Sequence, residues 1–357
     1  MKRMFATTVL FLSLSTTAPA FQIQPESEVG GIIQTLTPRH WWWKWIDGAL
    51  YSAMDSFTHS EHERVVQQVY GCPTTAECDV ATTGYPFAPA AVVAGSRWND
   101  NPPFELTTTR MSECAGRTIA LPNFAKCWYT LFRDGEKQAK RGAPLDLDSG
   151  AVIMLRSHFG DLQFLHSMAS TPSERASETR DRILMWIEFT WRTARGEFAN
   201  GTRLIDTRIP GMADHFKAGE TVQTLFTRGN PTHRKAVGQV AFGSLLHTLH
   251  DSFTRSHTDR DEVDGTTCGD QLPLRPGRIR HFLSYPQQSS TKHQQEDTRN
   301  AADLHLQTVK PNMVEVSAYL KRRLDDNATW DDIKPFVLCV FDLEDADAET
   351  GPGAFAI

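Results

Sequence analysis

The sequence predicts a mainly helical protein that carries an irregular, disulfide-stapled insertion in its first half. From about residue 150 onward, apolar residues recur at helical spacing over several long segments. Residues 72–150 are instead rich in proline, threonine, glycine and asparagine, which favours loops with short strands. Four of the six cysteines fall in that stretch. The chain of 357 residues could form one large domain or two smaller ones, and we expect a single helical domain over 21–357.

The first twenty residues have the pattern of a secretory signal peptide. Lys2 and Arg3 precede the apolar run VLFL at 9–12, and Ala-Pro-Ala at 18–20 supplies a cleavage site of small residues. The run is too short to span a bilayer, and no later segment is long and apolar enough to do so. We therefore expect a protein without a transmembrane segment, secreted or periplasmic.

Helices are expected from residue 46 to 70, with a break near Phe57, and then over four longer segments. These segments are 151–170, 173–198, 233–257 and 297–324. Ser173 is a suitable N-cap for the second, and Asp297 lies near the start of the fourth. The acidic, then glycine- and proline-rich tail at about 343–357 is expected to fray.

The cysteines are expected to form disulfides, because their number is even and the destination is oxidising. Among the possible connectivities we prefer the pairs Cys72–Cys78, Cys114–Cys127 and Cys268–Cys339. No CxxC motif is present, so cysteine ligation of a metal is the less favoured interpretation.

The charge balance bears on the class of partner. The net charge of −6 becomes about −8 once Lys2 and Arg3 leave with the signal peptide. An acidic surface does not attract polyanions at long range, so a dedicated nucleic-acid binder is less expected.

The segment HTLHDSFTRSH at 247–257 is the densest group of potential metal ligands. On a helix, His247 and Asp251 share one face, and His257 is rotated from His247 by about 80°. Zinc binds neutral imidazole nitrogen and carboxylate oxygen, so this pattern suits it. His250 is a competing ligand or a supporting group. The alternative is a set of hydrogen-bonded helix residues without a metal.

A second, weaker group is HQQED at 293–297. His293 and Asp297 again have i, i+4 spacing, and Glu296 is a neighbouring alternative ligand. Taken alone, such a pair is typical of a solvated helix face.

Two further groups lie earlier in the chain. In RSHFGDLQFLHSMAS, the residues His158, Asp161 and His166 stand among apolar side chains, where burial without a partner is costly. His158 and Asp161 can share a face, whereas His166 fits only if the helix starts or bends near Gly160. Ordinary core histidines are the alternative. Before the apolar run that follows residue 62, His59 and His62 are three apart, and either could reach a metal.

Together these segments resemble the superfamily of zinc-dependent phospholipases C and fungal-type single-strand nucleases. Its members hold three zinc ions between helices through His-x3-Asp-x5-His followed by His-x3-Glu/Asp. The segment 247–257 matches the first element, at His247, Asp251 and His257, and HQQED matches the second, at His293 and Asp297. The resemblance implies a helical zinc-dependent phospholipase C/nuclease-like bundle.

The segment HERVVQQVYG also resembles the superfamily's early metal histidine and the helix that follows it, which points to His62. The resemblance implies one zinc on His247, Asp251 and an upstream Asp/His pair, a second on His257, His293 and Asp297, and a third on His62 with Asp251 shared. Two or three zinc ions are expected, because the mature N-terminal tryptophan that completes the third site in the superfamily has no counterpart after cleavage at Ala20.

For the upstream pair we expect Asp161 with His166, or with His158. This choice departs from the superfamily, where the histidine normally follows the aspartate by well over ten residues. By the same resemblance, Asp161 would orient or deprotonate the nucleophile, and Asp161 and Asp251 are the expected catalytic residues.

The expected activity is phospholipase C hydrolysis of glycerophospholipids, with phosphatidylcholine as the candidate substrate at a membrane surface. Clustered zinc ions suit phosphodiester cleavage, because a water between them loses its proton near neutral pH and the metals neutralise charge on phosphoryl oxygens. The WWWKW run at 41–45 resembles an interfacial patch. The alternatives are a single-strand nuclease, in which the aromatic residues stack on bases, and a non-catalytic zinc-stabilised interaction protein.

Overall fold

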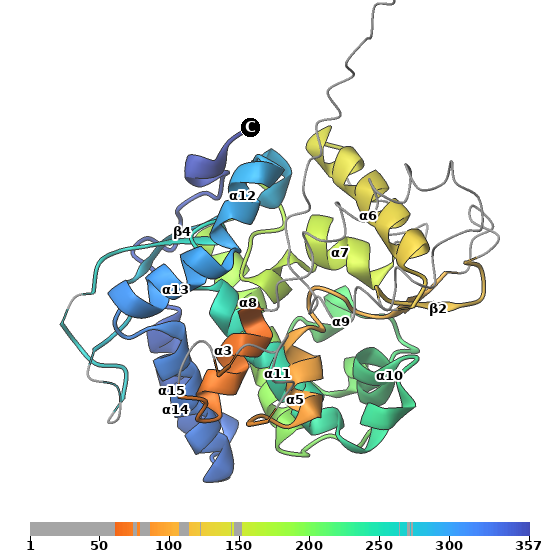
Figure 1. The fold of residues 1–357 in the computed structure, drawn as a ribbon, viewed down its shortest axis with the longest axis horizontal. Coiled ribbons are helices and arrows are strands. Elements are labelled where there is room, and N and C mark those ends of the chain that lie inside the picture. Colours follow the sequence, from red (N-terminus) through yellow and green to blue (C-terminus); the bar gives the residue numbers. More distant parts are fainter. Residues whose placement is uncertain are drawn as a thin grey trace, which may run out of the picture.

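The computed structural model describes residues 61–73, 77–78, 86–106, 114–121, 123–143, 145, 152–263, 265–269, 272 and 274–357. The expected signal peptide and the WWWKW run lie outside these residues. The described part is mainly helical, as predicted (Figure 1). Its α-helices are α3 (Glu61–Val69), α5 (Ala90–Ser96), α6 (Ala125–Lys140), α7 (Ile153–Phe159), α8 (Ala176–Ala194), α9 (Met212–His215), α10 (Val222–Thr227), α11 (Val237–Asp251), α12 (Ser290–Glu296), α13 (Arg299–Thr308), α14 (Met313–Asp325) and α15 (Trp330–Val340).

Short 3-10 helices and two small sheets complete the described elements. The 3-10 helices are η1 (Gln163–His166), η2 (Leu204–Asp206), η3 (Pro231–Lys235), η4 (Tyr285–Gln287) and η5 (Gly353–Phe355). Strand β1 (Phe104–Glu105) pairs antiparallel with β2 (Thr118–Ile119), and β3 (Thr258–Arg260) pairs antiparallel with β4 (Ile279–Phe282). The second ladder has a bulge between Asp259 and Arg260.

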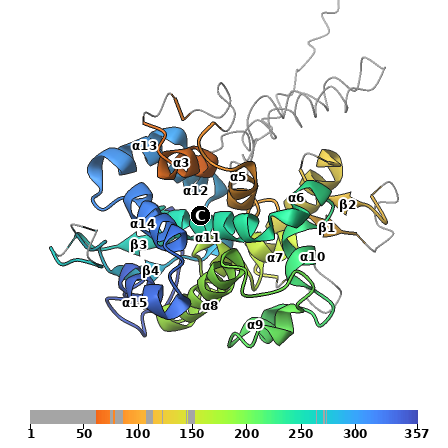
Figure 2. The same cartoon turned by 90° about the horizontal axis from the view of Figure 1, so that it is seen from below.

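Helix α11 is the centre of the fold. Its residues are apolar or small on nearly every side, and all but two of them are buried, which is the pattern of a helix surrounded by others. Helices α3, α5, α8 and α14 and the 3-10 helix η1 pack against it. Figure 2 shows α3 and α5 on one side of α11 and α8 on the other. The segments that carry the predicted ligands therefore gather around one axis.

Two glycines allow α5 to lie directly against α11. A Cβ on Gly243 would come within 2.0 Å of the Val92 carbonyl oxygen, and a Cβ on Gly95 would come within 2.1 Å of the Val240 carbonyl oxygen. Either side chain would force the two backbones apart, because real Cβ atoms do not approach that closely. This contact brings the end of α5, and the residues just after it, to the last turns of α11.

The expectation that 72–150 is a loop-rich insertion is only partly correct. The region does contain short strands and disulfides, but α5 belongs to the main core and α6 is a full helix. Trp128 and Phe132 of α6 are fully buried in a second apolar cluster with Phe159 of α7 and Tyr285 of η4. The composition of the region did not reveal that α6 has an apolar face. Because that face is packed against α7 and η4, this region is part of the folded core.

The disulfide pairing is confirmed. The structure joins Cys72 to Cys78, Cys114 to Cys127 and Cys268 to Cys339. The third bond ties the segment after β3 to α15, across a sequence separation of 71 residues.

The long helical segments are present with changed boundaries. The first bends at Gly160, as allowed for, into α7 and η1. The second begins after Arg175 instead of Ser173. The fourth is interrupted between α13 and α14 by residues 309–312, which contain Pro311. Proline lacks the N–H that a continuous helix would need there.

The expectation that residues 343–357 fray is wrong. The tail forms β-bridges from Leu343 to Ile279, from Gly351 to Leu283 and from Ala356 to Gln288. These long-range backbone hydrogen bonds hold it beside β4 and α12, which its polar composition could not indicate. No helix in the described ranges is both long and apolar enough to cross a membrane.

Candidate metal centre

The structure brings all the predicted metal ligands together except Asp161. They form three groups of side chains whose donor atoms lie within 4.8 Å of one another: His62, His247 and Asp251; Asp100, His158 and His166; and His257, His293 and Asp297. These nine residues are called the Asp251 cluster below. They come from helices α3, α7, α11 and α12, from the 3-10 helix η1, and from the residues that follow α5, α11 and α12.

Asp251, at the end of α11, is the junction of the groups. Its Oδ2 atom lies 2.9 Å from His166 Nδ1 and 3.0 Å from His247 Nε2. Its Oδ1 atom lies 3.3 Å from His62 Nε2. One carboxylate therefore faces imidazoles from three separate segments, and its two oxygens face different ones.

Four histidines are each oriented by a hydrogen bond from Nδ1 to a carbonyl oxygen. The acceptors are Ser96 O for His247 (2.6 Å), His166 O for His257 (2.8 Å), Met154 O for His158 (2.8 Å) and Gln288 Oε1 for His293 (2.6 Å). A carbonyl can only accept, so each Nδ1 carries the hydrogen and each neutral ring keeps its lone pair on Nε2. This arrangement is typical of metal-binding histidines.

Lone pairs from different segments then face each other. His247 Nε2 lies 3.1 Å from His166 Nδ1, and the Nε2 atoms of His257 and His293 are 3.2 Å apart. His166 fits the same pattern, because its Nε2 lies 3.2 Å from the Asn99 carbonyl oxygen. Two nitrogens bound to one tetrahedral zinc ion are about 3.3 Å apart, so a cation fits between each pair.

The carboxylates give a second, independent indication. Asp100 Oδ1 and Asp297 Oδ2 are buried and have no hydrogen-bond partner in the described part of the chain. Leaving a carboxylate oxygen buried without a donor is costly, and a bound cation would remove that cost. The nine residues therefore fit a group of metal ions in both their lone pairs and their charge.

The pKa shifts of His247, Asp297 and Asp100 agree with this interpretation. Burial lowers the pKa of His247 to about 3, with the neighbouring His62 acting in the same direction, which keeps the His247 ring neutral. Burial raises the pKa of Asp297 to about 7, and burial with the nearby Asp251 raises that of Asp100. Three carboxylates in one buried space repel one another, and a divalent cation would relieve the repulsion.

The prediction that Asp161 belongs to the centre is wrong. Arg156 donates to both Asp161 oxygens, at 2.8 and 2.6 Å, and His215 Nδ1 lies 3.1 Å from Oδ2. Burial opposes ionisation, but Arg156 and His215 lower the Asp161 pKa to about 2. The carboxylate is thus neutralised by its own neighbours, and Asp161 lies in none of the three groups.

Asp100 takes the place that the sequence analysis gave to Asp161. It follows α5 and is nearly inaccessible to solvent, with its Oδ1 3.6 Å from His247 Nε2 and 3.7 Å from His166 Nδ1. The spacing rule implied by the resemblance was a usable signal, because His158 and His166 follow Asp100 by far more than ten residues.

The sequence left three alternative metal ligands open, namely His250, Glu296 and His59. His250 lies outside the three groups: its Nε2 is 3.1 Å from Ser317 Oγ, and its ring stacks on that of His62. It supports His62 rather than joining the groups. Glu296 also lies outside them, and His59 is outside the described residues.

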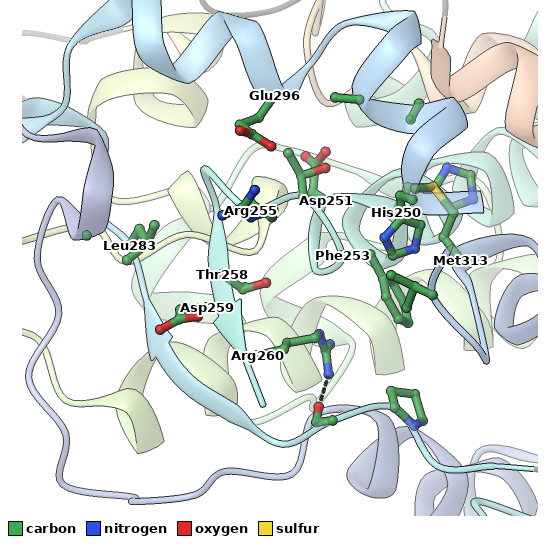
Figure 3. Close-up of a pocket in the computed structure, with 18 of the residues that line it drawn as sticks. His250, Asp251, Phe253, Arg255, Thr258, Asp259, Arg260, Leu283, Glu296 and Met313 are labelled. Carbon is green, nitrogen blue, oxygen red and sulfur yellow. Dashed lines mark hydrogen bonds between the residues drawn. The ribbon is translucent and has the colours of Figure 1, made fainter. Parts of the chain in front are cut away.

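A cavity of about 1020 Å³ opens at the cluster. His62, Asp100, Asp251 and Asp297 form part of its wall, and Figure 3 labels Asp251 among the lining side chains. Helix α13, none of whose residues is buried, forms another part. Apolar side chains on the cavity wall are Val65, Phe253, Val263, Leu283, Leu304, Val309, Met313 and Phe355. The arrangement could therefore present a bound metal group to a sizeable, partly apolar molecule.

Comparison with known proteins identifies no relative. No protein-family model matches the chain, and neither does any curated protein or solved structure.

Proposed function

We propose that the protein is a zinc-dependent phospholipase C with the helical bundle fold of that superfamily. It would hydrolyse glycerophospholipids to diacylglycerol and a phosphorylated headgroup. The observation that carries the proposal is the convergence of six histidines and three aspartates beside a large cavity. The cavity wall includes His62, Asp100, Asp251 and Asp297. The gathering of these side chains into three groups that could each hold a metal ion favours a metal centre over ordinary packing.

Zinc is the metal that the donor set favours. Imidazole nitrogens predominate, each group also contains a carboxylate, and no thiolate is available because the six cysteines form disulfides. When bound, clustered zinc ions lower the pKa of water and neutralise charge on phosphoryl oxygens, which is the chemistry that phosphodiester hydrolysis requires.

The chain's own residues hold and orient the site. Asp251 would contribute to two ions, since its oxygens face different histidines. Asp100 supplies the buried carboxylate that completes the group at His158 and His166. The carbonyl oxygens of Ser96 and Met154 fix two of the rings, so that the donor atoms need little reorganisation when a metal binds.

The cavity supports a lipid over a nucleic acid. Its apolar lining suits acyl or glycerol groups better than it suits a charged backbone. Glu262, Glu296 and Glu349 also line it and form no ion pair among the described residues. Carboxylates at the mouth would repel a polyanion and attract a cationic amine. Phosphatidylcholine, whose headgroup carries both a phosphate and a quaternary amine, is therefore the proposed substrate.

Export also belongs to the proposal. Three disulfides are typical of proteins in oxidising compartments, which agrees with the signal peptide expected at 1–20. We propose a secreted or periplasmic enzyme that acts at a membrane surface. N-terminal sequencing of the exported protein would show cleavage after Ala20, and an intact residue 1 would contradict it.

The deciding experiment measures phosphocholine release from lecithin micelles by the zinc-loaded protein. Activity should disappear in chelator and return with zinc. The variant His247→Ala should be inactive, whereas His233→Ala, which changes a histidine outside the cluster, should retain activity. Degradation of single-stranded DNA without lipid hydrolysis would favour the nuclease. Loss of folding in chelator, with no turnover of either substrate, would favour a structural zinc site.

A further inference from the structure

The loop between α11 and β3 is held by backbone hydrogen bonds and lies between two residues of the Asp251 cluster. It starts after Asp251 and reaches His257, and both belong to the Asp251 cluster. Thr254 N donates to Asp251 O at 3.0 Å, and His257 N donates to Thr254 O at 2.9 Å. The carbonyl of Ser256 accepts from Gln288 Nε2 at 2.8 Å. The backbone that supports Arg255 is therefore fixed relative to the metal centre.

Arg255 is the exposed residue of this loop, and its side chain lines the cavity. The neighbouring Ser252, Phe253, Ser256 and His257 are buried. Arg255 shares the cavity wall with Asp251 and Asp297, and Figure 3 draws it among the lining side chains. A guanidinium is thus present at the same opening as the ligands.

The other cationic side chains near the cavity already have partners. Arg260 donates to the carbonyl oxygens of Ser252, Gly277 and Val340. Lys310 pairs with Glu315, and Arg280 pairs with Asp259. In the described part of the chain, Arg255 has no ion pair or hydrogen bond of its side chain, although Glu262 and Glu296 line the same cavity.

We propose that Arg255 is an anion-binding residue that holds the phosphoryl oxygens of the substrate beside the metal centre. This inference rests on the proposed function, which makes the substrate a phosphodiester. A guanidinium presents a planar pair of N–H donors that matches two phosphate oxygens, and it gives up water more readily than an ammonium does. Because no described carboxylate forms an ion pair with Arg255, its positive charge is available to a bound phosphate. Because Arg255 lines the same cavity as Asp251 and Asp297, a phosphate bound by it would lie in the space that the cluster faces.

The test measures the binding of inorganic phosphate to the zinc-loaded protein, freed of excess zinc, by titration calorimetry. Arg255→Gln should weaken phosphate binding by about 10- to 100-fold, the range expected for charge-assisted hydrogen bonds. Arg255→Lys should give a smaller loss, because it keeps the charge without the paired donors. Zinc content and thermal stability should match those of the wild type, since the side chain is exposed.

Arg280→Gln is the matched control, because it removes the same charge from an exposed arginine already paired with Asp259. It should leave phosphate affinity unchanged. Equal affinities for wild type and Arg255→Gln would overturn the inference, whatever the activity. If phosphate binding depends on Arg255 but neither lecithin nor single-stranded DNA is hydrolysed, the anion site is supported and the phosphodiesterase proposal fails. Hydrolysis of one substrate, reduced in Arg255→Gln, identifies the source of the bound phosphate.

Discussion

Two regions of this protein place histidine beside aspartate, and they differ in what neutralises the carboxylate. At Asp161, both oxygens accept from Arg156 and one also contacts His215. In the Asp251 cluster, three carboxylates lie among six histidines, and Arg or Lys forms no ion pair with any of the three among the described residues. The first region is a completed ion pair. The second is a cluster that could hold cations.

The comparison shows that residue type and spacing do not by themselves distinguish a metal site from an ion pair. His158, Asp161 and His166 resemble a ligand set in the sequence, yet the middle residue belongs to a different interaction. The distinguishing feature is the direction of the remaining lone pairs. Where a ring is oriented by a carbonyl and its other nitrogen faces a second ring nitrogen, the pair is placed to hold a cation.

The largest expected effect is at the junction of the cluster. Asp251→Asn should lower phospholipid hydrolysis by at least about 1,000-fold, because the site loses the charge that two ions would share. Zinc content, measured by mass spectrometry of metals, should fall in parallel. Near-normal turnover in this variant would remove Asp251 from the centre and with it the proposed function.

The next prediction compares the two aspartates directly. Asp100→Asn should remove zinc from the group at His158 and His166, whereas Asp161→Asn should leave zinc content unchanged, since Arg156 rather than a metal neutralises Asp161. Metal analysis of both purified variants checks this. The reverse result would restore Asp161 to the ligand set and make Asp100 a structural residue.

The sequence predicted the ligands on α11 because helical geometry is regular: residues four apart share a face wherever the helix lies. Asp100 could not be predicted in the same way. It follows a short helix, AAVVAGS, whose place against α11 depends on a backbone contact between Gly95 and Gly243 that no periodicity reveals. The ordered tail is a similar case, because its backbone hydrogen bonds join residues far apart in sequence. By contrast, Arg156 is close enough to Asp161 in sequence to have signalled the ion pair.

An intermediate effect is expected at Gln288, which orients one ring of the cluster. Its Oε1 accepts from His293 Nδ1 at 2.6 Å, and its Nε2 donates to Ser256 O, which fixes the amide orientation. Gln288→Leu should weaken zinc binding at the His257–His293 pair by about 10- to 100-fold. Competition with a chelator of known affinity measures this. The adjacent, exposed Gln287→Leu should behave as wild type, and equal affinities in the two variants would deny Gln288 this role.

The smallest effect concerns the stability that the Asp161 ion pair provides. Its pKa of about 2 in the folded protein is lower than in the unfolded chain, about 4. A depressed carboxyl pKa stabilises the folded state above the unfolded value, and that stability is lost as the pH falls through the folded value. Wild type should therefore exceed Asp161→Asn by about 2 kcal/mol in free energy of unfolding at neutral pH, with the side chain's partial exposure reducing this. The difference should shrink as the pH falls from about 5 toward 2.

Urea unfolding of both proteins in metal-free buffer, at a series of pH values, measures that difference. The cluster titrates in the same way in each protein, so its contribution cancels and only the Asp161 pair remains. A difference that stays constant with pH would mean that Arg156 and Asp161 contribute through packing instead of charge. Such a result would weaken the contrast between the two regions, because the charge of Asp161 would then contribute nothing to stability. Only its distance from the three groups would then separate Asp161 from the metal centre.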